Sequence, residues 1–527
     1  MSGGLFKNIR VYGLACTIYW GILLFGYDTG VAGGVIATHA FKEAFGLLNV
    51  PQSHVDAVSS NVVAVLQGGA FFGALFSAPM SGWIGRKPTL IIFILIFVVG
   101  AVLQTAADAG TRGLNMIYVG RVIAGLGVGA ISAVCPAFVS ECAPKEVRGR
   151  ITGLFQIWVA TGVMLSYFVN YGMSRHITVG PRVWRVPFGF QLVPGGIMAF
   201  GLLFARESPR YLARAGKTEQ ALDNLAYYRR STVDDPEVRA EFAEIEATIL
   251  EEREARAGLG WKEAFFGPGQ WIRFVIAFTI FCLQQFAGQN SVGYYAPRIF
   301  QSIGYTGTTP SFLASGVYGI VKVVATAIFI FVGVEWFGRK WSLFWSAIWM
   351  GIFFYMVGAL QKTHPPAVRS DDYVPPASKA MAGLLYIYCV AYSFGWGPLP
   401  WVYVSDIFPN RTRHYGLAFA SATQWLFNFV ISKITPTLVS KLGWKLFIMF
   451  ATINVLGMGT FSLLIPETKG KSLEEMDIIF GAITAEERAK DITKAEHVVD
   501  DEVRHGGPAP GSSDQDVEKG SISQRSK

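Results

Sequence analysis

The sequence predicts an all-α membrane protein whose twelve transmembrane helices form two pseudo-symmetric six-helix halves. Three observations predict this fold: the composition, a series of long apolar runs, and motifs that occur once in each half. Of the 527 residues, 52% are hydrophobic and only 16% are charged, whereas a soluble domain usually carries about 25% charge. This deficit of charge is typical of a chain whose solvent is mostly lipid.

Twelve apolar runs are long enough to cross a bilayer, because a spanning helix needs about 20 mostly apolar residues. They begin near Val11, Ser59, Thr89, Leu114, Ile151, Val186, Trp271, Ser311, Ser342, Met381, Gly416 and Leu446. We therefore expect an N-terminal half at 11–205 and a C-terminal half at 271–465. A polar loop at 206–270 separates the halves, with a short segment at 1–10 before them and a tail at 466–527 after them.

The basic residues predict the orientation of the helices. The net charge is +8, and Lys and Arg gather in short segments between apolar runs, for example at 86–87 and 339–340. Because cytoplasmic loops are rich in Lys and Arg, we expect these segments, the middle loop and both termini to face the cytoplasm. A nucleic-acid-binding module would instead carry a basic face on a soluble domain, so nucleic acid is not expected as a partner.

The polar segments and the cysteines add three expectations. Asp235-Pro236-Glu237 is typical of a helix start, so we expect short helices in the middle loop. The tail from Glu487 is polar and predicted to be disordered. The five cysteines form no close pair, which argues against a disulfide framework or a metal site. No nucleotide loop or nucleophile arrangement indicates an enzyme or a cofactor.

Three motifs occur twice, roughly 250–265 residues apart. The segment GWIGRK at 82–87 is matched by EWFGRK at 335–340. Glu141 precedes Arg148 by seven residues, and Asp406 precedes Arg413 by the same seven. The segment ESPR at 207–210 is matched by ETKG at 467–470. This duplication predicts two halves related by an axis along the membrane normal.

Taken in order along the chain, these motifs resemble the sugar porter family of the major facilitator superfamily. The resemblance extends from Gly26 to Met476 and includes GRK at 85–87 and 338–340, GR at 120–121, ESPRYL at 207–212, QQ at 284–285 and PETKG at 466–470. One motif alone would mean little, whereas the ordered set is specific. The resemblance implies the major facilitator fold and transport of a small polyhydroxylated substrate at the plasma membrane, with the protein acting as a monomer.

Charged residues are predicted to cluster at the cytoplasmic ends of the helices. The resemblance implies that they form a cytoplasmic gate, whose ion pairs hold one state and break when the halves rock. The alternative is that they only anchor helix ends and are solvated. The residues are Arg86, Glu141, Arg148, Glu207, Arg210, Glu335, Arg339, Asp406, Arg413 and Glu467.

A second set of side chains is predicted to lie inside the spans and bind the substrate. Amides offer donors and acceptors together, which suits a ring of hydroxyls, and an indole offers a flat apolar wall with one donor. The alternative is that these polar groups only link helices to one another. The residues are Gln156, Gln284, Gln285, Asn290, Lys322, Trp401, Trp425 and Asn428.

Asp28 lies in the middle third of the first apolar run, where an ionisable side chain is costly and marks a functional site. We interpret it as a proton-coupling residue with Arg121 as its partner, because motion of the halves could change the balance between burial and the nearby positive charge. The resemblance supports this role, since proton-coupled members of the family carry an Asp here. A purely structural pair with Arg121 is the alternative.

Lys322 lies near the centre of run 8, in the segment YGIVKVV at 318–324. A Lys at that depth needs a partner or water, and a carboxylate on the substrate could supply one. The segment resembles the fungal quinate and galacturonate permease branch of the family. Snorkelling or a pair with Asp28 is the alternative.

These observations predict a secondary active transporter that imports a sugar or a polyhydroxy acid, of the galacturonate or quinate type, by proton symport. Two alternatives stay open. The first is a transporter or passive facilitator of neutral hexoses or pentoses. The second is a sensor of the same fold that binds sugar without transporting it.

Overall fold

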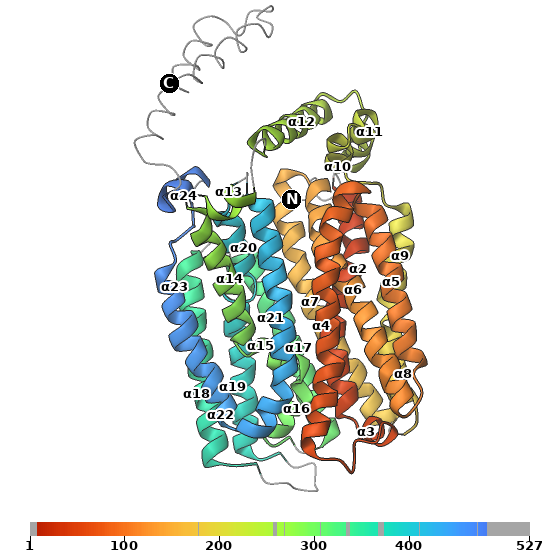
Figure 1. Cartoon of the computed structure of the whole chain (residues 1–527), viewed down its shortest axis with the longest axis vertical. Helices are drawn as coiled ribbons and strands as arrows, with labels where there is room; N and C mark the ends of the chain where they lie inside the picture. Colours follow the sequence, from red (N-terminus) through yellow and green to blue (C-terminus); the bar gives the residue numbers. More distant parts are fainter. Residues whose placement is uncertain are drawn as a thin grey trace, which may run out of the picture.

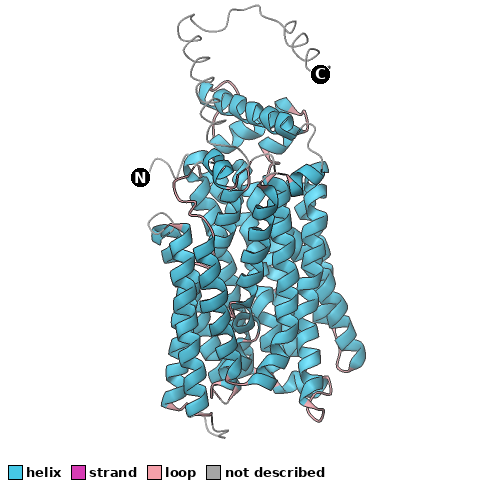
Figure 2. Cartoon of the chain, turned by 60° about the vertical axis from the view of Figure 1, so that its left-hand side comes forward, coloured by secondary structure: helices cyan, strands magenta, loops and turns pink. Residues whose placement is uncertain are grey.

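The computed structural model describes residues 8–177, 179–256, 261–267, 269–305, 307–333, 338–366, 374–409, 412–471 and 473–481. In this part of the chain the regular secondary structure is entirely helical (Figure 2). The all-α prediction is therefore confirmed. The expected disordered tail and the acidic residue Glu335 lie outside the described residues.

Nine helices among the described residues are long and apolar enough to cross a membrane. They are α2 (Ile9–Ala37), α4 (Gln52–Trp83), α5 (Arg86–Ala106), α6 (Thr111–Cys142), α7 (Lys145–His176), α8 (Arg182–Phe190) continuing into α9 (Leu192–Phe204), α17 (Thr308–Ile328) continuing into the π-helix η1 (Phe329–Gly333), α18 (Arg339–Thr363), and α22 (Lys445–Thr452) continuing through η2 (Ile453–Gly459) into α23 (Thr460–Leu464).

The other three predicted spans are also helical but are shorter or less apolar than these nine. They correspond to α14 (Gln270–Phe286), to α19 (Pro376–Ser393) with α20 (Leu399–Ile407), and to α21 (Arg413–Leu442). A break follows α14, which has 17 residues, and another break separates α19 from α20. The full count of twelve spans stays a prediction.

Small residues let the helices approach closely, as expected without a hydrophobic driving force between helices in lipid. Where α4 crosses α6, a Cβ added at Gly69 or Gly73 would overlap the backbone of α6. A Cβ added at Gly125 or Gly129 would overlap the backbone of α4. A side chain at any of these four glycines would force the two helices apart.

The helices form two bundles that lie side by side, α2 to α9 in one and α14 to α23 in the other (Figure 1). Each bundle has its own buried hydrophobic cluster, one around Phe97 and Val128 and the other around Phe281 and Phe354. The bundles meet where α4 packs against α21 and where α7 packs against α17.

Short helices of the middle loop lie together at one end of the bundles, which we call the middle-loop end (Figure 1). These are α10 (Pro209–Arg214), α11 (Thr218–Arg229) and α12 (Pro236–Arg256). Helix α12 begins at the predicted position, and Asp235 Oδ1 accepts a hydrogen bond of 2.9 Å from the Glu237 amide. Helix α11 packs on α12 through Leu225, Val238 and Phe242.

Five further short helices complete the described chain. Helices α13 (Trp261–Phe266) and α24 (Leu473–Ile479) lie at the middle-loop end, whereas α3 (His39–Ala44) lies at the opposite end (Figure 1). Helices α15 (Gln289–Tyr294) and α16 (Ala296–Ser302) continue the path of α14.

Candidate functional site

The helical backbone is interrupted at Gly288, between α14 and α15, inside the bundle. Gly288 has φ +95°, a conformation that side chains disfavour, and it separates α14 from α15. The break frees the Ala287 carbonyl, which accepts hydrogen bonds from Tyr388 Oη at 2.9 Å and Asn454 Nδ2 at 3.2 Å. Irregular backbone at membrane depth needs partners of this kind, and broken helices form substrate sites in other transporter folds.

Three of the predicted substrate-binding amides form one continuous chain at this break. Gln284 Nε2 donates to the carbonyls of Trp396 at 2.8 Å and Gly397 at 3.2 Å, in the segment that separates α19 from α20. Gln285 Nε2 donates to Gln284 Oε1 at 3.2 Å, and Asn290 Nδ2 donates to Gln285 Oε1. The chain therefore joins two broken helices. Gln284 and Gln285 are buried and Asn290 is partly accessible.

The other predicted binding residues come from both halves. Asn428 of α21 lies beside Tyr294 of α15 and is buried. Trp425 of α21 is also buried and contacts Phe25 of α2 across the interface, with ring centroids 5.4 Å apart. Two further residues of the set are partly accessible: Trp401, whose ring centroid lies 4.6 Å from that of Phe281, and Gln156 of α7.

Asp28 and Arg121 form an ion pair inside the N-terminal half. Arg121 donates from a terminal nitrogen to Asp28 Oδ1 at 3.2 Å, and both side chains are fully buried. Arg121 Nε also donates to the Val62 carbonyl at 3.0 Å. Asp28 Oδ2 and the second terminal nitrogen of Arg121 have no hydrogen-bond partner. The pairing predicted from sequence is therefore present, and one carboxylate oxygen of the pair stays unused.

Lys322 of α17 lies near Cys389 of α19 and is partly accessible. In the described part of the chain no carboxylate forms an ion pair with Lys322. The alternative partner considered from sequence, Asp28, pairs with Arg121 instead. The Lys322 ammonium thus lacks an acid of its own in the described bundle.

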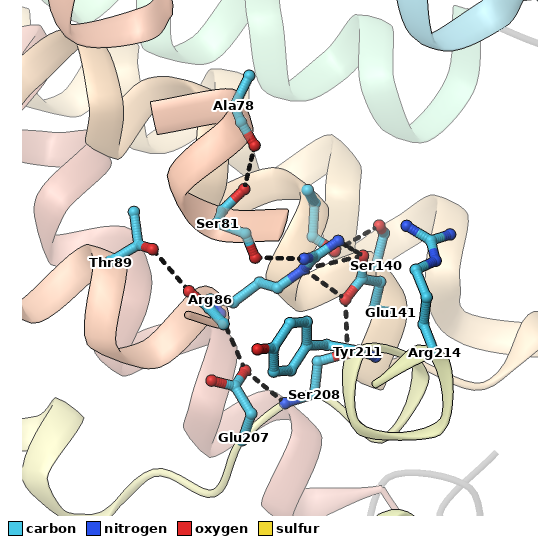
Figure 3. A network of polar contacts seen from close by, with 12 residues as sticks. Ala78, Ser81, Arg86, Thr89, Ser140, Glu141, Glu207, Ser208, Tyr211 and Arg214 are labelled. Atoms are coloured by element: carbon cyan, nitrogen blue, oxygen red, sulfur yellow. Dashed lines mark hydrogen bonds and ion pairs between the residues drawn. The ribbon is translucent and has the colours of Figure 1, made fainter. Parts of the chain in front are cut away.

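A compact polar network at the middle-loop end contains three of the predicted gate residues (Figure 3). Arg86 forms an ion pair with Glu141 at 2.7 Å, and Ser208 Oγ donates to Glu141 at 2.5 Å. The Glu207 carboxylate accepts from the backbone amides of Arg86 at 3.2 Å and Lys87 at 3.1 Å. Burial raises the pKa of Glu207, and the hydrogen bonds from backbone amides oppose that rise.

The C-terminal half contains a second copy of this network. Arg339 forms an ion pair with Asp406 at 3.6 Å, and Thr468 Oγ1 donates to Asp406 at 3.0 Å. The Glu467 carboxylate accepts from the backbone amides of Arg339 at 2.8 Å and Lys340 at 3.1 Å. The duplicated motifs therefore have duplicated contacts. Each ion pair lies within its own half and does not cross to the other. A role of these residues between the halves therefore stays a prediction.

Two further predicted gate residues, Arg148 and Arg413, lie within electrostatic range of the middle loop. Arg148 lies near Arg210, and it faces the acids of α12. Arg413, at the start of α21, is within electrostatic range of Asp406 and of Glu252 in α12. Arg413 therefore brings a positive charge of the C-terminal half close to an acid of the middle loop.

Sequence reasoning missed a set of polar contacts between the halves at the opposite end. Arg298 of α16 forms an ion pair with Asp56 of α4 at 2.5 Å, and Lys433 of α21 donates to Asn61 Oδ1 of α4. The available signal was Lys433 itself, because an ionisable residue within a predicted span marks a functional site.

Comparison with known proteins identifies the family. The profile of the family described as "Sugar (and other) transporter" matches residues 14–480. The chain belongs to this sugar transporter family. The resemblance inferred from the ordered motifs is therefore confirmed, and the protein is a transporter of the family rather than an enzyme.

Similar curated members of the sugar transporter family are named probable quinate permeases. Those of Neosartorya fischeri and Aspergillus niger are each 35% identical to this chain over 477 residues. The match covers 90% of this chain and 88% of each relative.

Similar solved structures confirm the major facilitator fold. The partially occluded, inward-open xylose transporter XylE from E. coli has a TM-score of 0.73 and 26% identity, covering 88% of this chain and 100% of that chain. A second structure, of the major facilitator superfamily proton:xylose symporter XylE with a bound glucose analogue, has a TM-score of 0.73 and 27% identity, covering 90% of this chain and 100% of that chain.

Proposed function

We propose that this sugar transporter imports a carboxylated polyol of the quinate or galacturonate type together with a proton, by alternating access. In this proposal the middle-loop end faces the cytoplasm, and the protein works as a monomer in the plasma membrane. The amide chain of Gln284, Gln285 and Asn290 holds hydroxyls, and the indoles of Trp401 and Trp425 flank the polyol ring. Lys322 holds the carboxylate.

The observation that carries the substrate class is the environment of Lys322. An ammonium at membrane depth without a carboxylate partner is unfavourable, and a bound substrate carboxylate would remove that cost. The Gln284 amide is hydrogen-bonded to the Trp396 carbonyl and to the Gln285 amide, so these side chains supply polar contacts without supplying charge. The similarity to probable quinate permeases supports the same class.

Proton coupling is supported by the Asp28–Arg121 pair. One oxygen of Asp28 binds Arg121 while the other has no partner, so a proton could bind there without first breaking the pair. The similar XylE structure is of a proton:xylose symporter. A proton carried inward would also offset the negative charge of the substrate, which the membrane potential opposes by about 2.3 kcal/mol per charge per 100 mV.

The decisive experiment measures uptake by the full-length protein in liposomes, with quinate, galacturonate, xylose and glucose as substrates. Each substrate is tested with and without an inward proton gradient. We expect acid uptake that accumulates only with the gradient. Glucose uptake without acid uptake would refute the acid class and favour the neutral-sugar alternative. Acid uptake that never exceeds equilibrium would indicate a facilitator, and binding without any transport would indicate a sensor.

A further inference from the structure

The two halves are joined at the opposite end by a charged pair between α16 and α4. Arg298 bonds Asp56 at 2.5 Å, and the same Arg298 nitrogen donates to Ser440 Oγ at 2.7 Å and to the Pro436 carbonyl at 3.3 Å, both in α21. Asp56 is almost fully buried, with a side-chain exposure of 5%. Arg298 is thus held on the C-terminal half by α21 and reaches across to the N-terminal half through its ion pair with Asp56.

A second cross-half contact lies about one turn deeper along α21. Lys433 donates to Asn61 Oδ1, and Tyr118 of α6 lies beside Asn61. Lys433 is partly buried, and no carboxylate in the described part of the chain pairs with it. Lys433 and Pro436 are three residues apart on one helix, so they share a helix face. The cations of Lys433 and Arg298 therefore lie along the same side of α21.

Positive charge predominates around Arg298. Lys42 of α3 lies close enough to Arg298 for repulsion, and burial together with Arg298 lowers the pKa of Lys42. Among the described residues that take part in these contacts, the cations are Lys42, Arg298 and Lys433 and the acid is Asp56. Because low-dielectric walls strengthen such a field, the position attracts an anion rather than a neutral polyol.

We propose that Arg298 and Lys433 form an outer carboxylate-binding site, which captures the acidic substrate before it reaches Lys322. This inference rests on the proposed function and on its orientation, which places the opposite end outside the cell. When the halves separate there, α4 withdraws Asp56 and Asn61 from the C-terminal half. Arg298 and Lys433 stay together on that half and lose these partners.

Exchange of partners gives the site a role in the transport cycle. A substrate carboxylate replaces the Asp56 carboxylate on Arg298 and the Asn61 carbonyl on Lys433, so the two cations of the C-terminal half keep a partner while the halves are apart. Release of the substrate toward the centre lets Asp56 and Asn61 return, which closes the opposite end behind it. Asn428 lies five residues from Lys433 on α21, about 7.5 Å along the helix axis, so the substrate has a short path to the central amides.

The test compares Lys433→Gln, Lys433→Arg and the unmutated protein in liposomes. Gln keeps a donor for Asn61 and removes the charge, whereas Arg keeps the charge. External KM and kcat are measured for quinate and for its uncharged methyl ester, at low and high salt. Lys441→Gln, a charge removal at an exposed position of the same helix, is the matched control.

We expect Lys433→Gln to raise the external KM for quinate at least about tenfold, as for loss of one charge-assisted hydrogen bond. The kcat, the KM for the methyl ester and the Lys441→Gln values should not change, and Lys433→Arg should restore the quinate KM. Added salt should weaken quinate capture by the unmutated protein more than by Lys433→Gln.

Equal changes for quinate and its ester would overturn the site and leave Lys433 as a contact between the halves only. An unchanged quinate KM in Lys433→Gln, with active quinate uptake, would also overturn the site while the proposed function stood. Absence of quinate uptake by the unmutated protein would refute the proposed function and this inference with it. Melting temperatures of all variants in detergent separate these outcomes from loss of folding.

Discussion

Two charged side chains inside the bundle have opposite environments. Asp28 has a partner in Arg121 at 3.2 Å, whereas Lys322 has no carboxylate partner in the described part of the chain. A charge at membrane depth is costly unless it is paired. The Asp28–Arg121 pair is therefore stable without substrate, whereas a bound anion would lower the cost of burying the Lys322 ammonium. The two residues thus suit two tasks, carrying a proton and binding an acid.

Replacing Asp28 by Asn should abolish accumulation of substrate against its gradient. Asn cannot release a proton, so the accumulation ratio should fall to about 1, while exchange of internal for external substrate continues, as expected when coupling alone is lost. The measurement is uptake in liposomes with and without an inward proton gradient. Accumulation that remained sensitive to an uncoupler in Asp28→Asn would exclude Asp28 from coupling.

Replacing Lys322 by Asn should raise the KM for quinate by roughly tenfold or more, because a charge-assisted hydrogen bond to the carboxylate is lost. Uptake of a neutral hexose, where present, should be unchanged or improved. The comparison is between the two substrates in the same liposomes. An equal loss of uptake for quinate and for the hexose would mean that Lys322 has a structural role and does not select substrates by their charge.

The broken helix α14–α15 positions the central amides. Its break depends on Gly288, whose φ of +95° and close contact with Phe354 leave no room for a side chain. An unbroken helix would bury the Ala287 carbonyl in its own hydrogen-bond ladder, and Tyr388 and Asn454 would lose an acceptor. The position of Gln285 relative to Asn290 follows from this local geometry.

Gly288→Ala should destabilise the protein by roughly 1–3 kcal/mol and lower substrate affinity, because the residue takes a strained conformation and its Cβ would lie 2.6 Å from Phe354. Gly293→Ala in the same broken helix is the matched control, since the nearest atom to its Cβ is 4.0 Å away. Melting temperature and equilibrium binding check both effects. A harmless Gly288→Ala would show that the break does not need a glycine.

At the scale of the whole molecule, the halves are organised differently at their two ends. At the middle-loop end each half holds its own charge network, Arg86 with Glu141 in one and Arg339 with Asp406 in the other. At the opposite end Asp56 and Arg298 join the halves directly. Transport by rocking of two bundles requires contacts that break and re-form, and this pair is positioned to do so.

Glu141→Gln and Arg413→Ala should slow net transport by about tenfold while leaving external substrate binding nearly unchanged. Both residues lie at the middle-loop end, away from the central amides, so they alter the balance between states through their differential energy. Steady-state turnover and equilibrium binding are measured on the same preparations. Weaker binding with normal turnover would contradict a gating role for these residues.

The sequence by itself determined the fold class, the family and the central pair. Apolar runs and duplicated motifs predicted two similar halves because lipid imposes its own length and composition on spanning helices. The twin contacts of Glu207 and Glu467 with backbone amides confirm that the motifs repeat in space. The Asp28–Arg121 pair was also predictable, since two opposite charges deep in neighbouring spans need each other.

Only the tertiary structure decided which polar groups meet across the halves. Arg298 and Asp56 are 242 residues apart and Lys433 and Asn61 are 372 apart, and no local pattern encodes such pairings. The joining of Gln284 to the carbonyls of Trp396 and Gly397 was equally hidden, because it depends on two helices breaking at the same depth. Hydropathy reports the environment of each helix, whereas these contacts depend on how the helices pack and where their backbones break.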